Sequence, residues 1–401
     1  MTLNIHSPNR AHRRPRFLTV IPDLGFAGAE RVTANLLNAM RPELFDYHLV
    51  TLTEYENQYQ VPDHVSWKVL HSPRVETAAW ALARHIRALK PDVICSHIVS
   101  MNICTAMSCA LSRVRPRLVM VEHHVATQAI VSDTSTKGTG MLHNLLVPAM
   151  RWTYPRADKI VGVSSAVLQE TLRVTGVDAS KGVVIPNPVV FSDFEARSAE
   201  HADHRWLDDP SYEVILGVGR LIPFKNFSLL IDAFARIAPH RPRARLVICG
   251  DGYLRPALEA QIRERGLEDR AELVGLRPNP YSAMRRAGVV AVTSFTEGLS
   301  TVLIEAMACG TPVVATDFAS ARETLPSCAH PPVALTPDAV ADAIVRVLSR
   351  PRETEQLKAF AAGFSINPVA RRYEQVLLSV LPAGEPAAEP QGVAGASTPP
   401  L

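Results

Sequence analysis

The chain has 401 residues, of which 47% are hydrophobic and 20% charged, and its formal net charge is +3. This length exceeds what one ordinary core supports and predicts two domains of a soluble globular protein. The small net charge gives no indication of nucleic-acid binding, and no apolar run approaches the ~20 residues that span a bilayer.

The N-terminus and the cysteines both favour a cytoplasmic protein. The first residues, MTLNIHSPNRAHRRPR, are basic, and no apolar segment of a secretory signal follows them. The six cysteines form no C-x-x-C pair and lie mostly among apolar neighbours. This usage is typical of small core residues in a reducing compartment, so we expect neither disulfides nor a metal site.

In the first half of the chain, apolar stretches alternate with helical patterns. The stretches RFLTVIPDL, YHLVTL, DVICSHI, RLVMVEH and KIVGVS predict strands, and GFAGAERVTANLLNAM and ETAAWALARHIRALK predict helices. Such alternation predicts an α/β domain with a doubly wound parallel sheet over residues 16–190. The basic segment 1–15 before it is predicted to be a disordered tail.

Residues 191–211 are polar and show no clear period, which favours a linker. The alternation restarts in a second domain, 212–365, with strands predicted at EVILGVG, ARLVICG, AELVG, GVVAVTS and PVVAT. Residues 366–382 predict a final amphipathic helix, and 383–401, rich in Pro, Ala and Gly, predict a disordered tail. Two facing domains of this kind leave a central cleft at the carboxyl ends of their strands, where ligands bind.

Two glutamates, Glu297 and Glu305, are the only charged residues in the apolar stretch GVVAVTSFTEGLSTVLIEAMACGTPVVAT. Ionised carboxylates are almost never buried without a partner. Ser300 is predicted to cap a helix that begins at Thr301, whose free N–H groups suit a phosphate. Glu305 then lies roughly 7 Å from this anion site, near the ribose of a nucleotide. The alternative is that Glu305 pairs with an arginine and Glu297 is a solvated loop residue.

Two cations follow the glycine turn of GVGRLIPFKN, residues 217–226. Arg220 and Lys225 suit a diphosphate, and Asn226 is a candidate N-cap of the next helix. A solvated pair of cations at a strand end remains the alternative. Ile222 occupies the third glycine position of a dinucleotide fingerprint, which disfavours a nicotinamide dehydrogenase.

The first domain offers fewer candidates. Gly28 lies in a turn where a backbone N–H can meet a phosphate or sugar, although such a turn is also an ordinary connection. Of the two histidines in EHH (122–124), His123 is predicted to face the cleft, with a structural histidine as the alternative. The apolar, aromatic and arginine-containing stretch 139–160 suits a membrane surface or lipid-linked acceptor, or else a core helix.

The ordered set AGAERV, EHH, VGRLIPFKN, VICGDG, ELVG and EGLSTVLIEAMACGTPVVATD resembles the retaining glycosyltransferases of family 4, which have the GT-B fold of two Rossmann-like domains. The resemblance covers about residues 16–380 and is strongest over 214–317. Two positions depart from the family pattern, since Ala27 replaces a glycine of the first loop and Asn226 replaces the glycine after Lys225.

The resemblance implies roles for individual residues. Glu297 lies at the donor sugar ring, His123 near the 6-position of that sugar, and Glu305 at the ribose. The implied catalytic residues are Glu297, His123, Arg220 and Lys225. The implied donor-binding residues are Gly28, Arg220, Lys225, Gly250, Arg277, Gly298, Leu299, Ser300, Thr301 and Glu305.

The resemblance also implies a reaction without cofactor. A nucleotide-diphosphate sugar, with UDP favoured and GDP as the alternative, donates to a saccharide acceptor in envelope or exopolysaccharide synthesis. We expect a lipid-linked acceptor and peripheral contact with the inner face of the cytoplasmic membrane. No D-x-D pair of the kind that holds a metal-bound diphosphate is found, so metal independence and retention by same-face attack are expected.

Three alternatives remain open at this stage. A nucleotide-sugar epimerase on the same fold would convert the donor without an acceptor. A pyridoxal-phosphate phosphorylase would need a lysine at a suitable strand end. A non-catalytic nucleotide-sugar-binding subunit would retain the binding residues and lack transfer.

Overall fold

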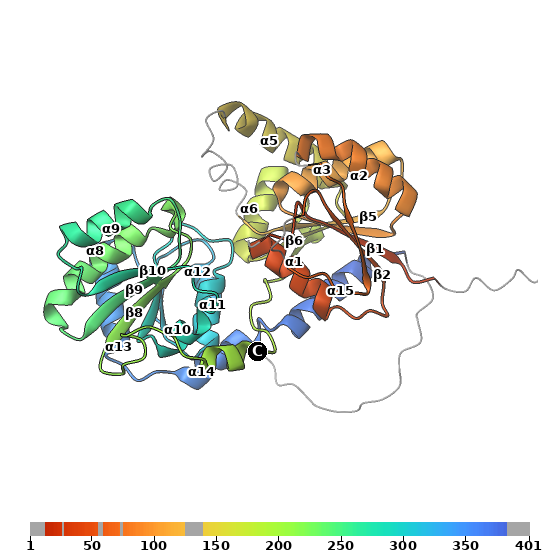
Figure 1. The fold of residues 1–401 in the computed structure, drawn as a ribbon. Coiled ribbons are helices and arrows are strands. Elements are labelled where there is room, and N and C mark those ends of the chain that lie inside the picture. Colours follow the sequence, from red (N-terminus) through yellow and green to blue (C-terminus); the bar gives the residue numbers. More distant parts are fainter. Residues whose placement is uncertain (1–12, 26–27, 55–58, 73–74, 125–138, 383–401) are drawn as a thin grey trace, which may run out of the picture.

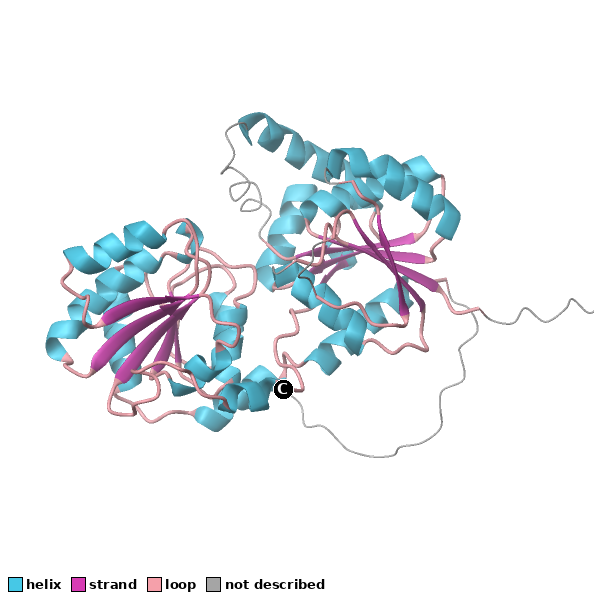
Figure 2. Cartoon of the chain, in the orientation of Figure 1, coloured by secondary structure: helices cyan, strands magenta, loops and turns pink. Residues whose placement is uncertain are grey.

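The structure is a computed structural model and describes residues 13–25, 28–54, 59–72, 75–124 and 139–382. Most of the predicted basic tail and the whole predicted C-terminal tail therefore lie outside the described residues. The described chain forms two domains, each with a twisted sheet between layers of helices (Figures 1 and 2). The N-terminal domain is on the right in both views.

The N-terminal sheet has seven parallel strands in the order β3-β2-β1-β4-β5-β6-β7. Thr19 of β1 lies opposite Leu49 of β2 on one side and Cys95 of β4 on the other. The strands are β1 (Arg16–Val20), β2 (Asp46–Thr51), β3 (Val65–Val69), β4 (Val93–His97), β5 (Arg117–Glu122), β6 (Lys159–Gly162) and β7 (Gly182–Val184). The order reverses between β1 and β4, as expected for a doubly wound sheet, so ligands are expected at the carboxyl ends of these two strands.

Helices cover both faces of this sheet. One face packs against α1 and the C-terminal helix α15, and the other against α2, α3, α5 and α6. The N-terminal helices are α1 (Gly28–Ala39), α2 (Val75–Leu89), α3 (Val99–Ser112), α5 (Thr139–Thr153) and α6 (Ser165–Thr175), with short turns η2 (Tyr154–Arg156) and η3 (Ala179–Lys181). The helical spacing expected in α1 is confirmed, because Val32, Leu36 and Leu37 are buried.

The C-terminal sheet has five parallel strands in the order β10-β9-β8-β11-β12. This order reverses between β8 and β11, so the second switch point lies at their carboxyl ends. The strands are β8 (Glu213–Val218), β9 (Ala244–Cys249), β10 (Ala271–Gly275), β11 (Val289–Val292) and β12 (Val313–Ala315). All five predicted strands of this domain are confirmed.

The helices of the C-terminal domain complete two hydrophobic layers, one on each side of the sheet. They are α8 (Phe227–Ile237), α9 (Arg255–Glu264), α10 (Tyr281–Arg286), α11 (Thr301–Ala308), α12 (Ala321–Thr324), α13 (Pro337–Leu348) and α14 (Thr354–Ala362), with turns η4 (Pro223–Lys225) and η5 (Ala238–His240). Among the described residues, no helix is long and apolar enough to cross a membrane.

Two segments join the domains. The stretch 191–211, interpreted above as a linker without periodic structure, contains the six-residue helix α7 (Phe194–Ala199). Its Phe194 and Trp206 are buried in the core of the C-terminal domain, so this stretch packs as part of that domain. The final helix, α15 (Ile366–Val380), returns to the N-terminal domain and buries Tyr373 and Leu377 beside α1 (Figure 1).

Candidate functional site

Lys225 and Glu297 meet at the C-terminal switch point. Lys225 ends the turn η4 after β8, and its Nζ donates to Glu297 Oε1 at 2.6 Å. The hydroxyl of Ser294, just after β11, donates to the same oxygen at 2.6 Å. The predicted diphosphate cation and the predicted sugar carboxylate therefore bond each other in this structure. A hydrogen bond between two oppositely charged groups is short and strong.

The predicted capping bonds around this site are wrong, although both cap positions are right. Ser300 occupies the N-cap of α11 and Asn226 that of α8, yet neither side chain accepts a bond from its helix. Asn226 adopts a left-handed conformation with φ 49°, which turns the chain sharply after Lys225. The Ser300 hydroxyl is buried and has no hydrogen-bond partner among the described residues. A buried hydroxyl beside free helix N–H groups can serve a ligand oxygen.

The glycines at the strand ends permit close backbone approach. A Cβ at Gly250 would lie 1.8 Å from the carbonyl oxygen of Gly219, and both residues have φ in the range that favours glycine. Packing of the β8 and β9 ends therefore accounts for Gly250 in itself. Arg277 lies close enough to Cys249 to oppose the effect of burial, which raises the pKa of that thiol to about 11.

The loop before α11 touches the N-terminal domain. A Cβ on Gly298 would lie 2.1 Å from the carbonyl oxygen of His123. Burial lowers the pKa of His124, and the charge of Glu297 opposes that fall, so Glu297 also lies near β5. Leu299 is buried and Thr301 half-buried in the same segment. The structure thus brings His123 beside the loop that carries Glu297.

Glu305 bonds an arginine from the other domain. Arg31 of α1 donates through Nη2 to Glu305 Oε1 at 2.9 Å, and the Glu305 side chain is 5% exposed. The charge of Glu305 is the main cause that raises the pKa of Arg31. The alternative in which Glu305 pairs with an arginine is therefore realised, and the motif AGAERV contained the partner. Arg31 was missed because nothing in the sequence connects α1 to α11.

Glu30, the residue before Arg31 in α1, faces Arg220. Burial raises the pKa of Glu30, and the charge of Arg220 opposes that rise, so the two side chains lie near each other. One Glu30 oxygen is buried without a hydrogen-bond partner among the described residues. Arg220 is exposed, and Gly28, at the first position of α1, has open space where a Cβ would stand. The start of α1 therefore faces the residues predicted to hold the donor.

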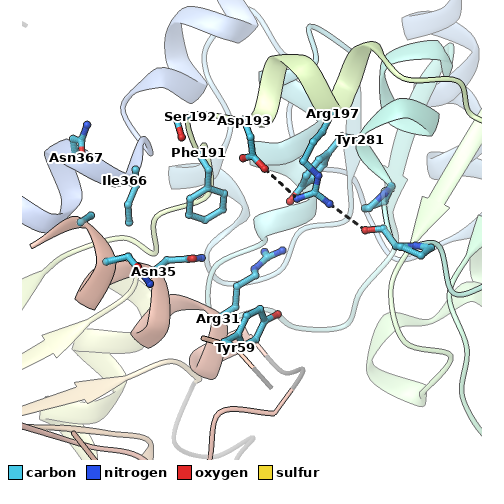
Figure 3. A pocket seen from close by; sticks show the side chains of 14 residues that line it. Arg31, Asn35, Tyr59, Phe191, Ser192, Asp193, Arg197, Tyr281, Ile366 and Asn367 are labelled. Carbon is cyan, nitrogen blue, oxygen red and sulfur yellow. Dashed lines mark hydrogen bonds and ion pairs between the residues drawn. The ribbon is translucent and has the colours of Figure 1, made fainter. Parts of the chain in front are cut away.

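A cavity of about 710 Å³ lies between the domains (Figure 3). Asn35 and Asn38 of α1 line it from the N-terminal domain, and Arg197 and Tyr281 from the C-terminal domain. Arg197 donates to the carbonyl oxygen of Pro278 at 3.1 Å. None of the predicted donor residues lines this cavity, which shares only Arg31 with the contacts described above. The candidate site is therefore the set of charged side chains around the N-terminus of α11 and not this cavity, because a large volume by itself does not indicate a reaction.

A buried polar network lies behind His123. Its Nε2 is 3.2 Å from Nδ1 of His97, at the end of β4. Glu122 accepts a bond from Asn102 Nδ2 at 2.7 Å and another from the Tyr154 hydroxyl. Burial raises the pKa of Glu122 to about 7. Sequence reasoning found His123 and missed these partners, which come from separate elements.

Two family models match adjoining parts of the chain. The model described as Glycosyltransferase Family 4 matches residues 26–192, and that described as Glycosyl transferases group 1 matches residues 199–363. The two matches correspond to the N-terminal domain and to the C-terminal domain with its preceding segment.

Curated relatives cover most of the chain. It is 30% identical, over 76% of its length and 81% of the relative, to N-acetylgalactosamine-N,N'-diacetylbacillosaminyl-diphospho-undecaprenol 4-alpha-N-acetylgalactosaminyltransferase of Campylobacter jejuni. It is 28% identical to the amylovoran biosynthesis glycosyltransferase AmsD of Erwinia amylovora, over 72% of this chain and 77% of that protein. Among solved structures, HepE of Anabaena in complex with UDP-glucose matches with a TM-score of 0.69 and 20% identity, over 91% of this chain and 99% of HepE.

Proposed function

The chain belongs to the group 1, family 4 glycosyltransferases with the GT-B fold, and from that premise we propose that it transfers a sugar from a UDP-sugar to a lipid-linked saccharide, with retention of configuration. One observation carries the proposal. Glu297 and Glu305 flank the N-terminus of α11, where Lys225 bonds the first and Arg31 the second. Cations, helix N–H groups and two carboxylates then converge around one small region.

In this proposal, the donor lies along α11. The diphosphate is held by Arg220, Lys225 and the first-turn N–H groups of α11, and the Ser300 hydroxyl bonds a phosphate oxygen. Glu305 accepts hydrogen bonds from the ribose hydroxyls through Oε2, the oxygen that Arg31 does not contact. Glu297 accepts a hydrogen bond from a hydroxyl of the donor sugar once Lys225 bonds the phosphate in place of Glu297. The UDP-glucose complex of HepE, a protein of the same fold, supports UDP as the nucleotide.

The transfer needs these groups to stabilise a leaving diphosphate. The bond from the sugar C1 to the phosphate oxygen breaks, and the acceptor oxygen forms a new bond to C1 on the same face. The acceptor proton moves to the leaving phosphate oxygen. Positive charge from Arg220, Lys225 and the α11 N-terminus stabilises the negative charge that develops on the diphosphate, so the step is proposed to need no metal.

A thermal-shift experiment with UDP, GDP and UDP-sugars tests the donor site. UDP at 100 times its Kd should stabilise the protein by about 2.7 kcal/mol, a rise of a few degrees in Tm. Glu305→Gln should lose this shift. Glu374→Gln is the matched control, because Glu374 is an equally buried carboxylate that bonds Arg41 away from α11. Equal losses in both variants, or no shift with any nucleotide, would contradict the proposal. Conversion of UDP-sugar without an acceptor would indicate an epimerase.

Exposed side chains of α5 and of the turn after it support a membrane-bound acceptor. Leu145 and Trp152 of α5 are 63% and 52% exposed, and the guanidinium of Arg156 lies 3.9 Å above the Trp152 ring. The Campylobacter relative is named for an undecaprenol-linked acceptor. Exposed apolar and aromatic side chains beside an arginine suit the interface of an anionic bilayer. We infer that α5 rests on the membrane that carries the acceptor.

Flotation with vesicles of phosphatidylglycerol and phosphatidylcholine tests this contact. The double variant Leu145→Ser/Trp152→Ser should bind about tenfold less than the natural protein, since each side chain buries apolar area in the interface. Tyr253→Ser is the control, because Tyr253 is 68% exposed on the other domain. If the double variant and the control bind alike, α5 is not the contact.

A further inference from the structure

We propose that His97 is a positioning residue, which fixes the His123 ring in the tautomer that carries its proton on Nδ1. The role of His123 toward the donor sugar rests on the proposed function, whereas its tautomer does not. His97 ends β4 and His123 directly follows the neighbouring strand β5. Their rings are stacked, with centroids 5.5 Å apart and planes inclined by 26°.

One proton is shared across the contact between the two imidazoles. His97 Nδ1 and His123 Nε2 are 3.2 Å apart, and both side chains are buried. Burial lowers the pKa of His97 to about 4 and holds that of His123 well below its usual range, so both rings are neutral near pH 7. A neutral imidazole has one donor and one acceptor nitrogen. The donor of the pair therefore fixes the tautomer of both rings.

Cys95 decides which ring is the donor. It lies two residues before His97 on β4 and so points to the same face of the sheet. Its Sγ is 3.7 Å from His97 Nε2. Burial raises the pKa of the Cys95 thiol to about 12, so it keeps its proton. Because a thiol sulfur is a weak acceptor and imidazole nitrogen a good one, the S–H donates to Nε2. His97 then donates through Nδ1, and His123 accepts through Nε2.

The outcome is an N–H donor on His123 at a buried position, with the acceptor oxygen of Asn187 beside it. His123 Nδ1 and Asn187 Oδ1 are both buried and lack hydrogen-bond partners among the described residues. The pKa of His123 is lowered mainly by burial, and Asn187 opposes this, so an acceptor lies beside the ring. A proton on Nδ1 lets His123 donate to Asn187 Oδ1 or, in the proposed complex, to a hydroxyl oxygen of the sugar. The other tautomer would present an acceptor beside an acceptor, which is unfavourable.

Nitrogen-15 NMR of histidine-labelled protein tests this inference. The His123 ring is assigned as the signal set that disappears in His123→Gln. The natural protein should show His123 protonated at Nδ1. His97→Asn places an amide N–H near the position of Nδ1 and should keep that tautomer. His97→Leu removes the donor and should shift His123 toward protonation at Nε2. Thermal unfolding of both variants verifies that they fold.

Activity provides the second readout. With a UDP-sugar as donor, kcat of His97→Leu should fall about tenfold, and His97→Asn should recover most of the loss. Protonation of His123 at Nε2 in the natural protein would overturn the proposal, as would an unchanged tautomer in His97→Leu. If no variant transfers sugar, the proposed function fails, but the NMR result still decides the role of His97.

Discussion

Glu305 bonds Arg31 in the first turn of α1 and Glu374 bonds Arg41 just after that helix, but the oxygens of the two carboxylates are engaged to different extents. Both oxygens of Glu374 are engaged: Oε1 accepts from the Arg41 backbone N–H at 2.8 Å and from Arg371, and Oε2 accepts from Arg41 Nε at 3.0 Å. Among the described contacts, the hydrogen bond to Glu305 goes to Oε1, from Arg31. The interior carboxylate is saturated by the fold, and the one at the domain interface keeps capacity for a ligand.

Glu122 and Glu297 repeat this contrast with different partners. Glu122 lies inside the N-terminal domain and accepts from neutral groups, the Tyr154 hydroxyl and Asn102 amide. Glu297 accepts from a cation, Lys225, next to a loop that touches the other domain. The hydrogen bonds from these neutral groups lower the pKa of Glu122, but burial outweighs them and favours the protonated carboxyl. In both pairs, the carboxylate of the candidate site lies where the two domains meet, and the carboxylate of the scaffold lies inside one domain.

The largest expected effect comes from Glu297→Gln. The amide keeps the shape of the side chain but removes its negative charge. That charge contacts Lys225 and, in the proposed reaction, the charge that develops on the sugar. We expect kcat to fall by about 10²–10³, the typical loss for one electrostatic contact in a transition state. The Kd for UDP, measured by calorimetry, should change far less, because UDP lacks the sugar.

Glu213→Gln is the matched control for this variant. Glu213 pairs with Arg241 at 3.0 Å at the amino end of β8, the end of the strand opposite the site. Its loss should leave kcat and the UDP affinity close to those of the natural protein. Equal losses of turnover and UDP affinity in Glu297→Gln would contradict a contact between Glu297 and the donor sugar. They would show that Glu297 acts only in nucleotide binding.

The fold was largely predictable because its periodic signals are local. Strands and helices buried on defined faces, such as β8 and α1, follow directly from apolar spacing. The edge strand β3 was not predicted, since two of its five residues are only half-buried and two more, Ser66 and Lys68, are exposed and polar or charged. Helix α7 was missed because six residues are too few to establish a helical period. The burial of α7 depends on the packing of Phe194 against Tyr281, whose ring centroids lie 4.5 Å apart.

The site was predictable mainly within the C-terminal domain, with His123 as the residue found in the other domain. The spacing of Glu297, Ser300 and Glu305 is set by one loop and one helix, so sequence alone placed them together. Their partners come from elsewhere: Arg31 is 274 positions from Glu305, and Lys225 is 72 positions from Glu297. No pattern in a single sequence encodes such pairs, and the buried network of His97 and Glu122 was missed for the same reason.

The smallest expected effect is the pH dependence that Glu122 gives to stability. Its pKa is raised from 4.5 to about 7, and the causes are burial, which raises it, and the hydrogen bonds from Tyr154 and Asn102, which lower it. Below pH 4.5 the carboxyl is protonated in the folded and unfolded chain, and its full contribution to stability is present. Between pH 4.5 and 7 the unfolded chain releases the proton while the folded chain retains it, so this contribution is lost as the pH rises.

Comparison of unfolding between pH 5 and 8 for the natural protein and Glu122→Gln measures this effect. The stability of the natural protein relative to the variant should fall with rising pH, by on the order of 2 kcal/mol, somewhat less than the full shift implies because part of it lies below pH 5. Tyr154→Phe removes a bond that lowers the pKa of Glu122, so it should extend the loss to higher pH. Parallel pH profiles in all three proteins would show that Glu122 is ionised in the fold. Its burial inside one domain would then not separate it from the carboxylates where the domains meet.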